Sequence, residues 1–212
     1  VATDAPAAAP PAIQQRAILV DSARRTALLR HLATTEAWPR ALVFVATQYA
    51  AEHVADKLRR AGLRAEALHG RQSAGRRAAG LQDFQAGKLQ LLVATDLAAR
   101  GIDLPGLPVV LQHDLPRSAV DHLHRIGRTG RAGAGGTAIS FILADAPGSE
   151  AHFRLIEKRQ QQRVPREVVD GFAPAAAPLP PPVADGNGGV KGRRPSRKDR
   201  LRAAAAAAGQ KP

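Results

Sequence analysis

The sequence LLVATDLAARGIDLPGLPVVLQHDLPRSAVDHLHRIGRTGRAG, residues 91–133, decides how this chain folds. It begins with an apolar run at residues 91–94, and a run without polar alternation is typical of a strand buried on both faces. Thr95 and Asp96 then fall at the carboxyl end of that strand. In open α/β sheets ligands bind beyond this end. If this cluster is considered alone, a strand followed by an ordinary polar turn is an equally good interpretation. Three residues of the next turn are candidates for contact with a ligand: Arg100, Gly101 and Asp103.

A second cluster, HRIGRTGR at residues 124–131, follows a predicted helix. Ser118 with Asp121 three residues later resembles a helix start, and Gly127 is a natural stop. Two guanidiniums on the glycine-flanked loop beyond that stop would form a phosphate clamp, because the planar fork of arginine binds phosphate oxygens in pairs. A solvated basic loop is the alternative. The two arginines are Arg128 and Arg131.

Together these clusters resemble a specific family. VATDLAARGID and HRIGRTGR resemble motifs V and VI of the DEAD-box RNA helicases, and upstream VFVATQ and ALHGRQSAGRR resemble motif IV and the segment after it. The similarity runs from about Ile13 to Ile142 with the motifs in the family's order. Related DEAH helicases and other superfamily-two translocases carry variants of the last motif. The resemblance implies the second, C-terminal RecA-like domain of a DEAD-box enzyme.

The composition fits one globular domain with tails. The chain has 212 residues, of which 44% are hydrophobic and only 3% aromatic, so Ala, Leu and Val must fill the core. No apolar run is long enough for a membrane span and no signal peptide is visible, which leads us to expect no membrane association and a cytoplasmic protein. Without cysteine there are no disulfides and no thiolate metal site. The net charge of +13 favours polyanions as partners, nucleic acid first.

The absence of methionine, even at position 1, is a further feature of the composition. It leads us to expect either a processed product or, more readily, a fragment of a longer protein.

Strand-like and helix-like segments alternate along the chain. This pattern predicts an α/β fold, a RecA-like parallel sheet with helices on both faces. The predicted strands are residues 16–20, 41–45, 65–68, 89–94, 108–112 and 137–143. The predicted helices are residues 22–33, 48–60, 73–86, 118–127 and 149–162.

Composition also divides the chain into four regions. Residues 1–12 are an Ala/Pro-rich linker, and residues 13–168 are the RecA-like domain. Residues 169–189 are a Pro/Gly-rich linker, and residues 190–212 are a basic, Ala-rich tail that we expect to be disordered because it cannot bury a core.

The chain lacks the motifs that grip a nucleotide. No GxxxxGK[ST] phosphate loop is present, since the nearest approach at residues 80–88 has the wrong spacing, and no D-E-A-D sequence occurs. The resemblance therefore implies that ATP and Mg²⁺ are held mainly by an N-terminal RecA-like domain, and that this chain alone is inactive.

The resemblance assigns roles to residues at the cleft between the two domains. Arg128 and Arg131 would be arginine fingers that reach the γ-phosphate. Asp103 would bind the ribose, and Gly101 would let the turn of the ATP site pass close to its neighbours. Three residues would couple the two RecA-like domains: Arg100, His124 and Arg125.

RNA is the second partner that the resemblance implies. The family contacts the sugar-phosphate backbone in regions that here contain Thr47, Gly70, Arg77 and Thr95. Two departures from the family pattern are Ala74, where Gln is usual, and His122, where Tyr is common. Phe44, in motif IV, is assigned equally to the core and to the cleft.

His122-x-His124 could suggest a metal site, but no third ligand has suitable spacing, so we expect no metal ligands. The tail, in contrast, is expected to tether RNA, because one aspartate opposes seven basic residues on a Pro/Gly-rich leash. These are Lys191, Arg193, Arg194, Arg197, Lys198, Arg200 and Arg202.

Two functions from different classes compete. One is the C-terminal half of an ATP-dependent RNA helicase that remodels RNA duplexes or RNA-protein complexes; the other is a non-enzymatic RNA-binding or scaffold module that kept the fold. Arg128, Arg131 and Asp103 favour the enzyme, because a binding module needs no γ-phosphate sensor. A DNA translocase is a weaker third alternative.

Overall fold

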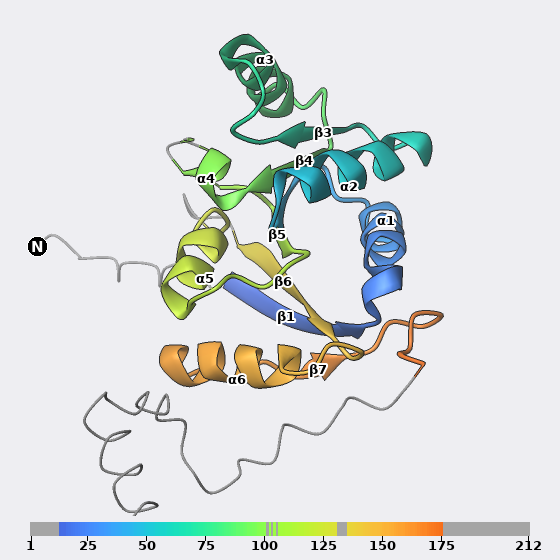
Figure 1. The fold of residues 1–212 in the computed structure, drawn as a ribbon, viewed down its shortest axis with the longest axis vertical. Helices are drawn as coiled ribbons and strands as arrows, with labels where there is room; N and C mark the ends of the chain where they lie inside the picture. The colour runs from blue at the N-terminus through green and yellow to red at the C-terminus, as the bar shows by residue number, and fades with distance from the viewer. Residues whose placement is uncertain (1–12, 101, 103, 105, 131–134, 176–212) are drawn as a thin grey trace, which may run out of the picture. The chain divides into compact units, whose positions relative to one another are not determined.

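The computed structural model describes residues 13–100, 102, 104, 106–130 and 135–175, so the predicted linker at 1–12 and the basic tail lie outside the described residues. Within this part of the chain, seven parallel strands form one sheet in the order β3-β4-β2-β5-β6-β1-β7 (Figure 1). The strands are β1 (Ile13–Val20), β2 (Ala41–Val45), β3 (Ala65–Leu68), β4 (Leu91–Thr95), β5 (Val109–Gln112), β6 (Gly136–Leu143) and β7 (Arg166–Glu167).

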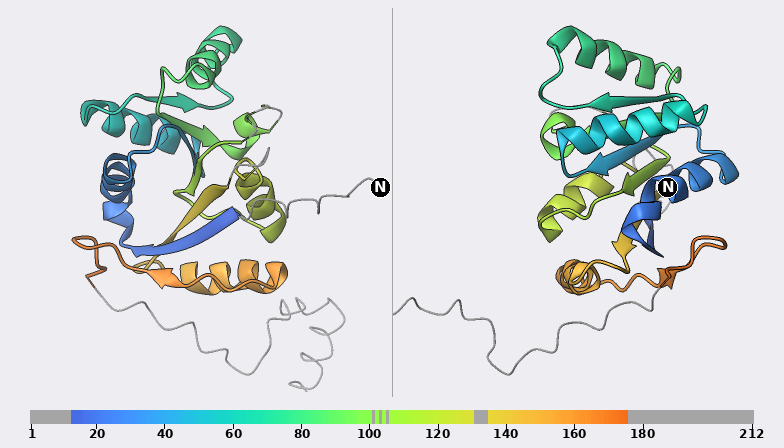
Figure 2. Two further views of the ribbon diagram at one scale, coloured as in Figure 1. Left: turned by 180° about the vertical axis from the view of Figure 1, so that it is seen from behind. Right: turned by 45° about the vertical axis from the view of Figure 1, so that its right-hand side comes forward.

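Helices cover both faces of the sheet, as predicted. The chain crosses the sheet in one direction from β1 to β2 to β3 and returns from β3 through β4 and β5 to β6. Because parallel crossovers are right-handed, the two directions place their helices on opposite faces (Figures 1 and 2). One face carries α1 (Arg25–Thr35) and α2 (Gln48–Arg60), and a 3₁₀ turn, η1 (Ser22–Arg24), precedes α1. The other face carries α3 (Ala74–Gln85), α4 (Asp96–Ala99), α5 (Ala119–Ile126) and α6 (Ser149–Gln160).

The central strands separate two apolar layers. Successive side chains of a strand point to opposite faces, so Val43 packs with α1 and α2 while Phe44 packs toward α3 and α4. Phe84 of α3 is fully buried in the second layer, and burial of such a ring stabilises the fold by about 1.5–3 kcal/mol. The sheet is therefore a rigid base whose carboxyl edge carries the loops of the site.

Three helices that begin near this edge are each capped by the hydroxyl of a Ser or Thr side chain. The Thr47 hydroxyl accepts from the backbone N–H of Ala50 at 3.0 Å. Ser73 and Ser118 cap α3 and α5 in the same way. Each cap satisfies a backbone donor that would otherwise lack a partner and fixes where its helix starts.

The structure differs from the predicted elements in a few places. β1 begins at Ile13, three residues before the predicted start at residue 16, because its polar residues still pair with β6 through the backbone. α4 and β7 were not predicted, since four and two residues are too short for a periodic pattern. Beyond β7, Val169 and Phe172 pack against the core. None of the described helices is long and apolar enough to cross a membrane.

Candidate functional site

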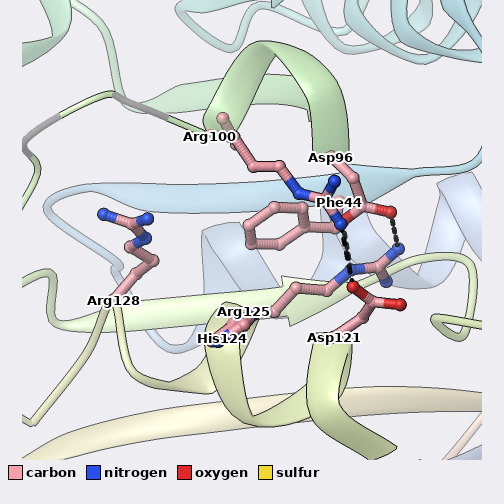
Figure 3. Close-up of a pocket in the computed structure, with 8 residues that line it drawn as sticks. Phe44, Asp96, Arg100, Asp121, His124, Arg125 and Arg128 are labelled. Carbon is pink, nitrogen blue, oxygen red and sulfur yellow. Dashed lines mark hydrogen bonds and ion pairs between the residues drawn. The ribbon is translucent and has the colours of Figure 1, made fainter. Parts of the chain in front are cut away.

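The carboxyl ends of β2, β4 and β5 meet at one edge of the sheet, and two hollows open there. The first, which we call the arginine hollow, lies between α4, α5 and the loop after α5 (Figure 3). It is lined by Phe44, Asp96, Ala99, Arg100, Asp121, His124, Arg125 and Arg128.

Arg125 forms the floor of the arginine hollow. Its side chain is only 3% exposed, and its Nε and Nη2 atoms each donate to a carboxylate oxygen of Asp96 at 2.7 Å. Nη1 donates to the carbonyl of Asp114 at 2.7 Å and toward Gln112 Oε1 at 3.4 Å. The donors of Arg125 are thus used within the domain, where they tie α5 to α4 and β5. Arg125 is buried, whereas the Asp96 side chain is 39% exposed, so the ion pair is partly buried.

Phe44 belongs both to the core and to the site. The sequence assigns it equally to these two roles. The ring is 2% exposed and packs in the second apolar layer. Its centroid also lies 4.9 Å from the guanidinium carbon of Arg125. This cation–π contact fixes the guanidinium against the sheet.

A second ion pair lies at the mouth of the arginine hollow. Arg100 Nη2 lies 3.0 Å from Asp121 Oδ1, and the Arg100 side chain is 67% exposed (Figure 3). The hydroxyl of Ser118 donates to the other carboxylate oxygen of Asp121 at 2.8 Å. This hydrogen bond and the charge of Arg100 lower the pKa of Asp121. His124 is exposed beside this pair and makes no hydrogen bond or ion pair with another described residue.

Arg128 is set apart from both ion pairs (Figure 3). Nη1 donates to the carbonyl of Ile102 at 2.9 Å, and the other four guanidinium N–H donors have no partner among the described residues. The backbone below it is clamped, because the N–H of Leu107 donates to the Arg128 carbonyl at 3.1 Å and the buried hydroxyl of Thr129 donates to the Leu107 carbonyl. Arg128 is therefore a cation with unused donors on a fixed backbone.

Other predicted residues of the ATP site and the tail lie outside the described residues. These are Gly101, Asp103, Arg131 and the seven basic residues Lys191, Arg193, Arg194, Arg197, Lys198, Arg200 and Arg202.

The second hollow, which we call the threonine hollow, adjoins the first and measures about 590 Å³. Asp96 lines both hollows. Two residues predicted to bind RNA lie here, with Thr47 exposed and Thr95 buried to 8% exposure. The full lining is Ala46, Thr47, Gln48, Tyr49, Arg71, Thr95, Asp96, Leu97 and Arg117.

The other residues predicted to bind RNA lie beside the threonine hollow or farther away. Gly70 adjoins it, since a β-carbon added there would lie 3.9 Å from Gln48 Nε2. Arg77 is exposed on α3 and does not line the hollow, and Ala74 is exposed at the start of the same helix. Sequence reasoning missed Arg71, although it directly follows Gly70.

Asp114, also missed from the sequence, positions the loop that carries Thr47. One carboxylate oxygen accepts from the backbone N–H of Ala46 at 2.8 Å, and the other pairs with Arg25. Burial alone would raise the pKa of Asp114, but the adjacent imidazole of His113, the hydrogen bond from Ala46 and the charge of Arg25 lower it well below its usual range. Asp114 therefore remains a carboxylate that holds the loop.

His122 lies in a buried polar network under α5. Gln112 Nε2 donates to His122 Nδ1 at 2.9 Å and to Ser140 Oγ at 3.2 Å. Since Nδ1 accepts, Nε2 carries the proton and faces Gln15 Oε1 at 3.2 Å. Burial and then the charge of Arg125 lower the pKa of His122 to about 4. The ring is thus neutral at physiological pH.

The two imidazoles of His122-x-His124 lie in different environments, one buried and one exposed. Among the described residues, no group of three or more His, Asp or Glu side chains could hold a metal ion.

Known proteins share this sequence pattern. The model of the helicase conserved C-terminal domain matches residues 23–133. The ATP-dependent RNA helicase DBP2 of Debaryomyces hansenii is 38% identical over 154 residues, which are 72% of this chain and 29% of that protein. The DEAD-box ATP-dependent RNA helicase CshA of Geobacillus kaustophilus is 36% identical over 160 residues, which are 76% of this chain and 34% of that protein. This chain thus spans about three tenths of the length of these curated relatives.

Solved structures share the fold as well. The E. coli DEAD-box protein SrmB, bound to regulator of ribonuclease activity A, aligns with a TM-score of 0.73 at 36% identity, over 78% of this chain and 96% of that chain. S. cerevisiae Dbp5, bound to RNA and ADP BeF3, aligns with a TM-score of 0.69 at 30% identity, over 76% of this chain and 43% of that chain. The motifs, the fold and these relatives agree, so the chain belongs to the DEAD-box RNA helicases, as their C-terminal RecA-like domain.

Proposed function

We propose that this chain is the C-terminal half of an ATP-dependent RNA helicase that remodels RNA duplexes or RNA-protein complexes. It acts with an N-terminal RecA-like domain and is inactive alone. The relatives named above are ATP-dependent RNA helicases, and the chain contains no phosphate loop. A cytoplasmic location stays a prediction.

The observation that carries the proposal is the state of Arg128. Arg125 donates to Asp96 and Asp114, whereas four N–H donors of Arg128, on a clamped backbone, have no partner in the part of the chain that the structure describes. A guanidinium in this state suits a polyphosphate bound to a facing domain, where its charge stabilises the transition state of phosphoryl transfer. We therefore assign Arg128 as an arginine finger. Three further assignments from the resemblance stay proposals: Arg131 as a second finger, Asp103 for the ribose, and Gly101 for the turn beside it.

The residues present fit the phosphates of ATP better than its magnesium ion. Among the described residues, Asp96 and Asp121 are the carboxylates that line the arginine hollow, and each is already paired with an arginine. Mg²⁺ prefers carboxylate and phosphate oxygens, so these paired groups are poor ligands for it. Mg²⁺ is accordingly proposed to be held mainly by the N-terminal domain.

RNA is proposed to bind across the threonine hollow. Thr47 and Thr95 offer hydroxyls, and the guanidiniums of Arg71 and Arg117, which pair with no other described residue, offer charge to phosphates. Gly70 adjoins the hollow, while Arg77 would reach RNA from α3. The structural relative Dbp5 was solved with RNA bound.

The two hollows share a rigid connection, which supports coupling between them. Asp96 lines both, and its bidentate pair with Arg125 joins α4 to α5. Displacing either helix would strain this bidentate pair. In this proposal Arg125 couples the sites from within the domain, while the exposed Arg100 and His124 are the groups that face the N-terminal domain.

The test replaces Arg128 in a protein that joins this chain to an N-terminal RecA-like domain. Arg128→Ala should slow ATP turnover on the order of a thousandfold while the KM for ATP changes little, because the lost contact acts in the transition state. Arg128→Lys should restore only part of the rate, since lysine lacks the planar fork.

Arg60→Ala is the matched control. Arg60 is an exposed arginine, 80% accessible, at the end of α2 opposite the carboxyl edge, and its removal should leave turnover unchanged. Near-normal turnover of Arg128→Ala would refute the finger assignment. No ATP turnover by the joined natural protein, with RNA binding intact, would favour the non-enzymatic RNA-binding module instead.

A further inference from the structure

Tyr49 occupies an unusual position in the threonine hollow. It is the only tyrosine of the chain and is 76% exposed, the highest value among the large apolar side chains of the described residues. Leu97, at 71%, is the next most exposed and lines the same hollow from α4. Single exposed apolar residues are common, but here the two most exposed ones face one cavity.

The ring of Tyr49 is held in place by a second ring. Tyr49 and His53 lie one helical turn apart on α2, with centroids 5.6 Å apart and an angle of 12° between the planes. This stack supports one face of the tyrosine ring, and the high exposure of Tyr49 leaves much of the remaining ring open to the hollow. A supported aromatic ring loses little conformational entropy when a flat ligand stacks on it.

Charge around the ring indicates the kind of ligand. Arg71 and Arg117 line the hollow, and neither makes a hydrogen bond or ion pair with another described residue. The one carboxylate in the lining, Asp96, is neutralised by its pair with Arg125. Two guanidiniums with no partner in the described part of the chain, beside an open aromatic ring, match a phosphate backbone that carries flat bases.

We propose that Tyr49 is a base-stacking residue: one nucleobase of single-stranded RNA stacks on its ring, and Arg71 and Arg117 bind the flanking phosphates. The inference rests on the proposed RNA binding and deepens it, since contacts to the backbone alone would not distinguish RNA from a strand without bases. Every base has a flat face, so the contact adds affinity with little sequence preference.

The single tyrosine gives a direct readout. In the whole 212-residue chain labelled only at tyrosine, the NMR ring signals all come from Tyr49. At low salt, a short single-stranded RNA should shift these signals upfield, because a stacked base shields the ring protons. An abasic ribose-phosphate strand of equal length and charge should leave them nearly unmoved.

Affinities measured by fluorescence anisotropy complete the test. Tyr49→Ala should weaken RNA binding by about fivefold to a hundredfold and leave binding of the abasic strand unchanged. Tyr49→Phe should bind like the natural chain. Leu155→Ala, which removes a 62% exposed apolar side chain on α6, is the matched control and should change neither affinity.

The outcomes separate this inference from the proposed function. If RNA binds but the Tyr49 signals stay still, and Tyr49→Ala binds RNA as well as the natural chain does, then stacking is refuted while RNA binding stands. If neither strand binds at low salt, RNA binding itself is refuted, and the inference falls with it.

Discussion

Acidification should destabilise this chain through one buried histidine. His122 is 1% exposed, and burial and the charge of Arg125 lower its pKa from 6.5 to about 4. Its Nδ1 atom accepts a hydrogen bond from the Gln112 amide NH₂. A proton on Nδ1 would face this N–H donor and abolish the hydrogen bond. The folded chain therefore resists a proton that the unfolded chain accepts.

The sign and size of the effect follow from linkage. Above pH 6.5 His122 is neutral in both states, and its contribution to stability is fully present. As the pH falls below 6.5, the unfolded chain binds the proton first, so the free energy of unfolding decreases until the pH reaches the folded pKa. Between pH 7 and pH 5 this one group should lower the free energy of unfolding by about 2 kcal/mol. Buried carboxylates with lowered pKa values, such as Glu150 and Glu157, lose their contributions mainly below this window.

The measurement is urea unfolding at pH 7, 6 and 5 at constant ionic strength. The natural chain should lose about 2 kcal/mol more than His122→Gln over this range, because glutamine does not titrate. His53→Gln removes an exposed histidine and should keep the full loss. Equal losses in the natural chain and in His122→Gln would refute the reasoning.

Two further predictions concern packing and the tail. Gly136→Ala should lower the free energy of unfolding by about 1–3 kcal/mol, measured by thermal or urea unfolding, because the added β-carbon would lie 1.8 Å from Thr129 Oγ1. Gly135→Ala is the control: its β-carbon would meet nothing within 4 Å, so it should change the free energy of unfolding little. Cutting the chain after Ala175 removes the seven basic residues of the tail and keeps Phe172, which packs against the core. The slope of log affinity for RNA against log salt should become less steep by up to about 5, since each tail cation that binds a phosphate contributes roughly 0.7 to that slope. Equal salt slopes for the cut and uncut chains in RNA titrations would show that the tail does not bind RNA.

Much of the sheet was predictable because buried parallel strands leave a strong signal. The predicted bounds of β2 and β3 agree with the structure, since each is a short, mostly buried run between turn residues. Ser73 and Ser118 begin predicted helices and cap those helices in the structure, because a hydroxyl before an apolar stripe has a local hydrogen-bonding role.

The rest of the site depends on contacts that are distant in sequence. Asp96 and Arg125 are separated by 29 positions, and no local pattern indicates that they pair. The same holds for the link from His122 to Gln15, which are 107 positions apart. A sequence motif predicts a functional role for Arg125, but only the packed structure distinguishes its buried guanidinium from that of Arg128.

The most direct test of the central claim compares ATP hydrolysis by three samples with and without RNA: this chain alone, an N-terminal RecA-like domain alone, and the two joined. The claim is that this chain completes a catalytic site across a domain interface and cannot form one itself. We predict RNA-stimulated turnover only in the joined protein, and its loss when the joined protein carries Arg128→Ala. Robust RNA-stimulated turnover by this chain alone would contradict the account.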